Sequence, residues 1–283
     1  MSEQQNPGSL AGEPLSELKQ RMKASWMAGD FGQIAKRLAN GAEDFIARLN
    51  LQPGMKVLDV GCGTGNQSLP AARTGATVTG VDISTNLLEQ ARQRAAGENL
   101  KIQFDEGDAE QLPYGDAQFD VVLSMFGAMF APRPEYVVSE FKRVCKPGGL
   151  IAMANWTPDG FVGQSFRVTG RHAPPPPSVL PPVLWGSEEV VRQRFGSEVQ
   201  LEMNKRTVLF DLPDTTAESV VDFFREYFGP TKVAFSRLDA EGQQRMRDDL
   251  IAHWRSCNVG DAKHIQVHAE YLEVHARLPG RSG

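Results

Sequence analysis

The fold of this chain of 283 residues is set by one segment, Val57-Leu58-Asp59-Val60-Gly61-Cys62-Gly63-Thr64-Gly65-Asn66. Its first half belongs to a short apolar strand, predicted over Met55–Val60, and its second half is a glycine-rich turn into a helix that ends near Arg73. Glycines at such a turn permit positive φ angles and let a ligand lie against bare backbone. The first N–H groups of the helix are also suited to bind a carboxylate. The segment therefore predicts a ligand-binding turn at the end of a strand.

Two acidic residues farther along the chain fall where other strands end. Asp82 closes a second predicted strand, Thr77–Val81, twenty-one residues after Gly61. A carboxylate at that point can accept hydrogen bonds from both hydroxyls of a ribose. Asp108 follows a third predicted strand, Lys101–Phe104, and its side chain or the neighbouring backbone is placed to reach an adenine edge. The glycine turn and the two acids together predict a site for an adenosyl amino acid.

A nicotinamide-dependent oxidoreductase is the main alternative, because its fingerprint G-x-G-x-x-G also lies between a strand and a helix. Here Asn66 occupies the position of the third glycine, and a glycine comes one residue early, at Gly65. That fingerprint does not require an acid at Asp59 either. The nucleoside triphosphate loop G-x-x-x-x-G-K-[ST] is absent from the sequence.

Strands and helices alternate on both sides of this segment. Helices are predicted at Ser84–Ala96 and Pro134–Val144, and further strands at Phe119–Ser124 and Leu150–Asn155. Lys146-Pro147-Gly148-Gly149 is predicted to turn the chain into the last of these strands. The rhythm is typical of right-handed βαβ units that build a parallel sheet.

The C-terminal part has a different texture. A proline-rich stretch over 172–182 predicts an extended linker. Two long strands, Val199–Asp211 and Ile265–Leu278, enclose helices that open with the capping-box pattern Thr215-Thr216-Ala217-Glu218. Gly229-Pro230 is expected to stop the first of these helices. We expect one sheet with an inserted helical cap, and a separate C-terminal domain is the alternative.

The expected fold is thus α/β: a Rossmann-like, doubly wound, mostly parallel seven-stranded sheet with a terminal antiparallel strand. N-terminal lid helices are expected over 15–50. The main domain would span 51–283 and carry the cap insertion at about 213–262. Residues 1–14 are polar, lack an apolar signal core and are expected to form a disordered leader.

Composition argues against several classes of protein. Hydrophobic residues make up 41% and charged residues 23%, a typical globular balance. The net charge of −5, without a Lys/Arg-rich stripe, argues against a nucleic-acid partner. Cys62, Cys145 and Cys257 lack CxxC spacing, which argues against a disulfide framework or a zinc site. No run approaches the roughly 18 apolar residues of a membrane helix. We expect a cytoplasmic monomer or homodimer without a membrane partner.

The sequence resembles the class I S-adenosylmethionine-dependent methyltransferases, in the methyltransferase type 11 subgroup similar to the ubiquinone/menaquinone biosynthesis C-methyltransferases. The likeness runs over about residues 55–155. It is carried by Val57–Gly65 with its spacing to Asp82, by Gly107-Asp108-Ala109-Glu110-Gln111-Leu112-Pro113, by Phe119-Asp120-Val121-Val122 and by Arg143-Val144-Cys145-Lys146-Pro147-Gly148-Gly149.

The resemblance implies that the chain binds S-adenosylmethionine without a metal. It implies methyl transfer to a small molecule by in-line displacement, which leaves S-adenosylhomocysteine. Asp59 would orient the loop or contact the methionine amino group. The residues implied around the cofactor are Asp59, Gly61, Cys62, Gly63 and Gly65 in the glycine loop, Asp82 at the ribose, Ile83 against the adenine, Asp108 and Ala109 at the adenine edge, and Ser124, Met125 and Phe126 near the sulfonium.

The acceptor is narrowed by elimination. Ser124-Met125-Phe126-Gly127 replaces the [DN]-P-P-[YF] pattern of enzymes that methylate base amino groups. The Pro-Cys nucleophile of cytosine methylation, the paired-Glu loop of arginine methylation and clustered metal ligands are also missing. A small, largely apolar or aromatic acceptor remains, with its accepting atom (O, N or C) open. A protein that binds the cofactor but has lost the transfer chemistry is the other alternative.

No catalytic base is assigned, because none of the five histidines lies in the strand-end loops. His172 and His253 are the histidines to test first. Two readings stay open for the aromatic residues. Trp26 and Phe31 either fold over the cofactor beside the sulfonium or pack a helix pair, and Trp156 is predicted to wall the acceptor pocket. One cap-helix face is either core or an acceptor pocket between cap and sheet; it carries Phe223, Phe224, Tyr227 and Phe228.

Overall fold

A computed structural model describes residues 15–177 and 179–280; the leader predicted over 1–14 lies outside the described residues. Seven strands form one sheet in the order β3-β2-β1-β4-β5-β7-β6. All neighbours up to β5 pair in parallel, and β7 runs antiparallel to both β5 and β6. The predicted fold class is confirmed. The strands are β1 (Lys56–Val60), β2 (Thr77–Asp82), β3 (Gln103–Glu106), β4 (Phe119–Met125), β5 (Cys145–Trp156), β6 (Gln200–Leu212) and β7 (Ile265–Arg277).

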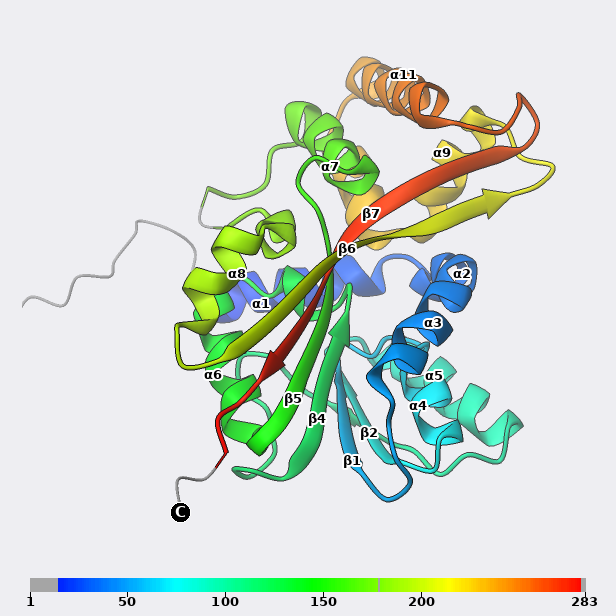
Figure 1. Cartoon of the computed structure of the whole chain (residues 1–283). Coiled ribbons are helices and arrows are strands. Elements are labelled where there is room, and N and C mark those ends of the chain that lie inside the picture. Colours follow the sequence, from blue (N-terminus) through cyan, green and yellow to red (C-terminus); the bar gives the residue numbers. More distant parts are fainter. Residues whose placement is uncertain (1–14, 178, 281–283) are drawn as a thin grey trace, which may run out of the picture.

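Helices cover both faces of this sheet (Figure 1). On one face lie α3 (Ala39–Leu49), α4 (Ser68–Arg73) and α5 (Thr85–Gly97), and on the other lie α6 (Pro134–Val144) and α8 (Glu188–Phe195). The central strands read as near-continuous apolar runs because both of their faces are covered. Leu58, Val122 and Ile151 are accordingly 0% exposed. Crossovers that leave β1 in opposite directions bring the carboxyl ends of β1, β2 and β4 to one edge.

The N-terminal segment crosses this carboxyl edge. It consists of α1 (Leu15–Met27), α2 (Phe31–Ala35), a short 3₁₀ turn η1 (Lys36–Leu38) and α3. The chain breaks between α1 and α2, and the Asp30 carboxylate caps α2 by accepting a hydrogen bond from the Gly32 N–H. We call α1 and α2 the lid helices from here on.

The C-terminal cap is carried by a long β-hairpin. β6 and β7 stay paired over 13 residues, whereas β5 pairs with β7 only over Leu150–Trp156. The hairpin therefore continues past the rest of the sheet (Figure 1). Three helices join its strands at the far end: α9 (Ala217–Tyr227), α10 (Gly229–Ser236) and α11 (Ala240–Cys257). α11 also packs against α7 (Phe161–His172).

Four local expectations need correction. The N-cap of α9 is Thr216, and its reciprocal partner is Ser219 rather than an acid. Gly229-Pro230 ends α9 but also begins α10, since proline is accommodated in the first helical turn. β5 begins at Cys145, so the Lys146–Gly149 turn is an irregular part of the strand, with a register shift against β4.

The fourth correction is α7, which the sequence reading missed. Gly163 and Gly170 lower its intrinsic helix propensity, and tertiary contacts override that preference. In the described part of the chain, no helix combines the length and apolar character needed to cross a membrane.

Candidate functional site

The three glycines of the loop after β1 have positive φ angles but different surroundings. A Cβ on Gly61 would lie 2.8 Å from the Gly127 Cα, so the loops after β1 and β4 pack backbone against backbone. A Cβ on Gly63, whose φ is +52°, would meet no atom within 4 Å. A Cβ on Gly65 would meet the Leu69 side chain at 2.7 Å. Gly63 thus faces open space. Gly65 was expected to line the site, but it packs against α4 instead.

The carboxylate of Asp82 holds this loop in place. One oxygen accepts a hydrogen bond from the Gly63 N–H at 2.9 Å, and the other accepts one from the Ser84 N–H at 2.8 Å. Burial raises the pKa of Asp82, and these two bonds oppose the shift. The acid at the end of β2 and the glycine turn after β1 therefore form one hydrogen-bonded unit.

Two residues expected at the cofactor lie beneath this unit instead. Asp59 is 0% exposed; one of its oxygens accepts a bond from the Ser68 hydroxyl at 2.5 Å, and the other has no partner. Burial raises the pKa of Asp59 to about 7, against the Ser68 bond. The Ser124 hydroxyl donates to the Val60 carbonyl at 2.6 Å and accepts from the Ala128 N–H. Ser124 thus pins the loops together and does not floor the site.

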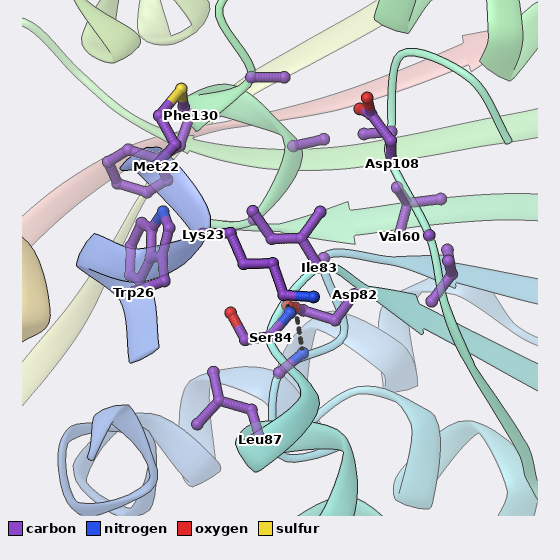
Figure 2. A pocket seen from close by; sticks show the side chains of 18 of the residues that line it. Met22, Lys23, Trp26, Val60, Asp82, Ile83, Ser84, Leu87, Asp108 and Phe130 are labelled. Atoms are coloured by element: carbon purple, nitrogen blue, oxygen red, sulfur yellow. Dashed lines mark hydrogen bonds between the residues drawn. The ribbon is translucent and has the colours of Figure 1, made fainter. Parts of the chain in front are cut away.

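A cavity of about 580 Å³ opens over the glycine turn, between the carboxyl ends of the strands and α1 (Figure 2). This volume lies in the range of about 300–1,000 Å³ typical of small-molecule sites. The cavity brings together residues from the lid and from four loops. Its walls include the sequence-predicted residues Trp26, Phe31, Gly61, Gly63, Asp82, Ile83, Asp108, Ala109 and Phe126.

Sequence reasoning missed other parts of this wall. Lys19, Met22 and Lys23 come from α1, and none of them was among the predicted site residues. Ser84 and Leu87 follow Asp82 at the start of α5, and their place directly after the strand-end acid was the available signal. All of these residues line the cavity.

Ion pairs tie α1 to the end of β3 and to the loop that follows it. The Lys19 ammonium contacts the Asp108 carboxylate and lies 2.6 Å from a Glu110 oxygen, and Lys23 pairs with Glu106. The Glu110 side chain is fully buried and is also held by Arg133, with 2.8 Å between Nε and the carboxylate. α1 is therefore fastened across the loop that follows β3.

A second, smaller cavity of about 90 Å³ adjoins the first. The two share four aromatic residues, Trp26, Phe31, Phe126 and Phe130. We call the second one the aromatic cavity, because eleven aromatic side chains line it. They are Trp26, Phe31, Phe126, Phe130, Trp156, Phe161, Phe166, Phe210, Phe224, Phe228 and Trp254.

The structure divides the cap-helix face into two pairs of residues. Phe224 and Phe228 line the aromatic cavity, while Phe223 and Tyr227 are absent from its wall. The Arg37 guanidinium lies over the Phe223 ring instead, with 5.6 Å between Arg37 Cζ and the ring centroid. Trp156 lines the aromatic cavity, as predicted for a pocket wall.

A third hollow of about 50 Å³ lies next to the glycine turn, and Cys62 and Met125 are among the residues that line it. It shares Phe31, Gly61, Gly63 and Phe126 with the large cavity, and Thr64 and Gln67 give it polar groups. Cys62 and Met125 thus border a side pocket and not the main chamber.

The histidines stay out of all three cavities in the described chain. His253 stacks on Phe161 behind the aromatic cavity, and its Nε2 lies 3.0 Å from the Phe161 carbonyl oxygen. Burial lowers the pKa of His253. His172 pairs with Asp249 at 2.8 Å. Over residues 15–177 and 179–280, no group of three His, Cys, Asp or Glu side chains could hold a metal ion.

Comparisons with known proteins found relatives of the sequence and of the fold. A family model described as "Methyltransferase domain" matches residues 58–153. The uncharacterised protein Rv1405c of Mycobacterium tuberculosis is 36% identical over 255 residues, which cover 88% of this chain and 93% of the relative. Methyltransferase GfsG of Streptomyces halstedii is 43% identical over 116 residues, or 40% of this chain and 42% of that protein. Among solved structures, a geranyl diphosphate methyltransferase in complex with S-adenosylmethionine aligns with a TM-score of 0.51 and 15% identity, over 85% of each chain.

Proposed function

Since the chain belongs to the class I S-adenosylmethionine-dependent methyltransferases, we propose that it methylates a small, largely apolar acceptor held in the aromatic cavity. One observation carries this proposal. The aromatic cavity shares Trp26, Phe31, Phe126 and Phe130 with the large cavity above the glycine turn. An acceptor on one side of these rings and a methyl donor on the other would meet at a common wall.

The residues of the large cavity fit the donor. The open face of Gly63 leaves room that a side chain would fill, so bare backbone is available to the ligand. Asp82 stands at the ribose position of the fold, and Asp108 and Ala109 stand at the adenine position. When bound, S-adenosylmethionine supplies an already activated methyl group.

The chain's own contribution is alignment and exclusion of water. The lid ion pairs hold α1 over the chamber, and the shared rings enclose its inner end. Orientation of two reactants in a dry site lowers the barrier of an in-line displacement without an acid or base. The residues described around the aromatic cavity supply hydroxyls from Ser165, Thr169 and Thr231 but no ionisable side chain.

A pair of neighbouring phenylalanines allows a matched test. Phe224 lines the aromatic cavity and Phe223, on the same helix, does not. Purified protein is incubated with S-adenosylmethionine and a panel of small aromatic and aliphatic acceptors, and mass spectrometry detects addition of one methyl group. We expect Phe224→Ala to lower kcat/KM at least tenfold for any acceptor found, and Phe223→Ala to change it less than threefold.

Two results would overturn the proposal. The first is equal sensitivity of turnover to the two substitutions. The second is tight S-adenosylhomocysteine binding with no turnover of any apolar acceptor, which would favour a cofactor-binding protein without transfer chemistry.

A further inference from the structure

We propose that the acceptor is an uncharged molecule whose nitrogen or sulfur lone pair takes the methyl group, so that it leaves as an onium cation. This inference rests on the proposed function, because it assigns the acceptor to the aromatic cavity. It follows from two features of that cavity, the lack of a proton acceptor in its wall and the arrangement of its rings. The third ground is the conservation of charge in methyl transfer.

The wall holds no side chain that could take a proton from an acceptor. Two of its three hydroxyls are engaged in their own helix: Ser165 donates to the Phe161 carbonyl at 2.9 Å, and Thr169 donates to the Ser165 carbonyl at 3.1 Å. Thr231 is a neutral alcohol and too weak a base for this task. An acceptor that had to lose a proton during transfer would therefore find no partner among the described residues of this wall.

Two ionisable groups that pack against these rings, His253 and Tyr271, are already engaged in hydrogen bonds. His253 lies behind Phe161 with its Nε2 at the Phe161 carbonyl. The Tyr271 ring touches Phe126 and Trp156 edge-on, but its hydroxyl accepts a hydrogen bond from Arg48 at 2.9 Å. Neither group reaches into the cavity. The cavity thus supports transfer to an atom that carries a free lone pair from the start.

Charge is conserved in such a step. The acceptor lone pair forms a bond to the methyl carbon, and the bond between that carbon and the donor sulfur breaks, with its electron pair going to the sulfur. No proton is released. The positive charge of the donor moves onto the acceptor nitrogen or sulfur, and S-adenosylhomocysteine is left neutral at sulfur. The charge therefore crosses from the large cavity into the aromatic cavity.

The rings that line the aromatic cavity suit a cation. Trp26 stands at the centre, with ring centroids 4.9 Å from Phe130, 5.6 Å from Phe228 and 5.8 Å from Phe31. Aromatic faces carry negative potential and attract onium groups within about 6 Å. The same faces repel an anionic acceptor. Among the described residues, the wall has no cationic side chain that would offset this repulsion. The cavity is thus matched to the charge of an onium product.

The first test measures binding of two molecules of equal shape and different charge. Choline carries a trimethylammonium group, and 3,3-dimethylbutan-1-ol carries an uncharged tert-butyl group in its place. Isothermal titration into the complex with S-adenosylhomocysteine should show choline binding at least tenfold more tightly. Equal affinities, or tighter binding of the uncharged alcohol, would overturn the inference.

A ring substitution tests whether the rings of the aromatic cavity cause the preference. Phe228→Leu keeps an apolar side chain but removes an aromatic face, so the preference for choline should fall at least threefold. Phe223→Leu is the control outside the cavity and should keep it. Thermal unfolding and S-adenosylhomocysteine affinity establish that both variants are folded. If both variants retain the full preference, the rings at the wall are not its source and the inference fails.

Methylation rates distinguish a nitrogen or sulfur acceptor from a hydroxyl acceptor, which must lose a proton. Pyridine offers a neutral nitrogen, thioanisole a neutral sulfur, and phenol a hydroxyl. We expect methylation of pyridine or thioanisole at least tenfold faster than that of phenol, and the faster of the two identifies the atom. Faster methylation of phenol would sink this inference while leaving the proposed function intact.

Discussion

The rings of Phe126 and Trp156 stack face to face, with centroids 3.6 Å apart and planes 5° apart. Phe126 follows β4 and Trp156 ends β5, so the stack joins the carboxyl ends of two neighbouring strands. The φ angle of Phe126 is +57°, and its N–H donates to the Ala154 carbonyl at 2.9 Å. A phenylalanine in this left-handed region is strained by about 1–2 kcal/mol. The strained residue lines all three cavities and so lies where they meet.

This strain can be measured by comparing two substitutions of Phe126. Phe126→Ala and Phe126→Gly both remove the ring and leave a similar cavity, but only glycine adopts a positive φ freely. We expect both variants to lose stability, and the glycine variant to be about 1 kcal/mol more stable than the alanine variant. Urea unfolding checks this. An alanine variant as stable as the glycine variant would show that the backbone at Phe126 is not strained.

The open face of Gly63 predicts a loss of cofactor binding without a loss of folding. Gly63→Ala places a methyl group in the large cavity, and we expect S-adenosylhomocysteine affinity to fall at least tenfold. Gly54 is a matched control, because its φ is +81° and a Cβ there would also meet no atom within 4 Å. Both variants should lose a similar amount of stability, about 1 kcal/mol, from the positive φ. Equal cofactor affinity of the two would contradict the assignment of Gly63.

Asp82 offers a second test of the cofactor site. Asp82→Asn keeps the shape of the side chain but turns one acceptor for the loop N–H groups into a donor. Loss of a hydrogen bond to a charged group costs about 1.5–3 kcal/mol, so affinity for S-adenosylhomocysteine should fall about tenfold to a hundredfold. Asp116→Asn, at an exposed acid that pairs with Arg143, should leave calorimetric affinity unchanged. Wild-type affinity in Asp82→Asn would refute the ribose assignment.

The lid ion pairs predict how fast the cofactor leaves. Lys19→Met removes the contacts to Asp108 and the buried Glu110, so the closed lid should open more often. We expect the dissociation rate of S-adenosylhomocysteine, followed by tryptophan fluorescence in stopped flow, to rise about fivefold to tenfold. Lys36→Met, at a lysine whose ammonium donates to the Gln33 side chain and contacts neither Asp108 nor Glu110 among the described residues, is the control. Identical rates in the two variants would mean that α1 does not gate this site.

The glycine segment and the alternation of strands and helices were accessible to sequence reasoning because they rest on local patterns. A strand with both faces covered must be apolar, and a turn with positive φ angles favours glycine. Asp82 could therefore be assigned to the same site as the glycine turn, although its hydrogen bond from the Gly63 N–H could not be predicted. Which glycine faces the ligand could not be predicted, because Gly65 is packed by Leu69 through tertiary contact.

The aromatic cavity was only partly accessible for the same reason. Its rings come from the lid, the strand ends, α7, β6 and the cap, and no local pattern records that these segments meet. Phe223 and Phe224 are adjacent in sequence, yet only Phe224 lines the cavity. Ser124 shows the reverse case, since its hydroxyl is directed to the Val60 carbonyl and not to a ligand. Side-chain direction at such positions depends on packing.

The buried Glu273 predicts a pH-dependent stability. Its carboxylate, 1% exposed on β7, is held by Arg48 of α3 at 2.6 Å, by Arg206 of β6 at 3.0 Å and by His275 at 3.3 Å. Burial opposes ionisation, but these partners prevail and lower the pKa of Glu273 to about 2. The pKa of Glu273 is lower in the folded than in the unfolded protein. The ionised carboxylate therefore stabilises the fold at pH values above the ordinary pKa of glutamate, and this effect is lost as the pH falls toward 2.

Glu273→Gln should therefore lower the free energy of unfolding by about 3 kcal/mol at pH 7, since two arginines would lose their buried anion. The difference from the wild type should narrow below the ordinary pKa of glutamate, where the unfolded carboxylate takes up its proton, and nearly vanish close to pH 2. Glu270→Gln, on the same strand at a partly exposed pair with Lys205, should cost less than about 1 kcal/mol at any pH. Urea unfolding from pH 7 to pH 3 gives both curves. A loss in Glu273→Gln that stays constant over this range would show that the folded carboxylate is not held ionised by its partners.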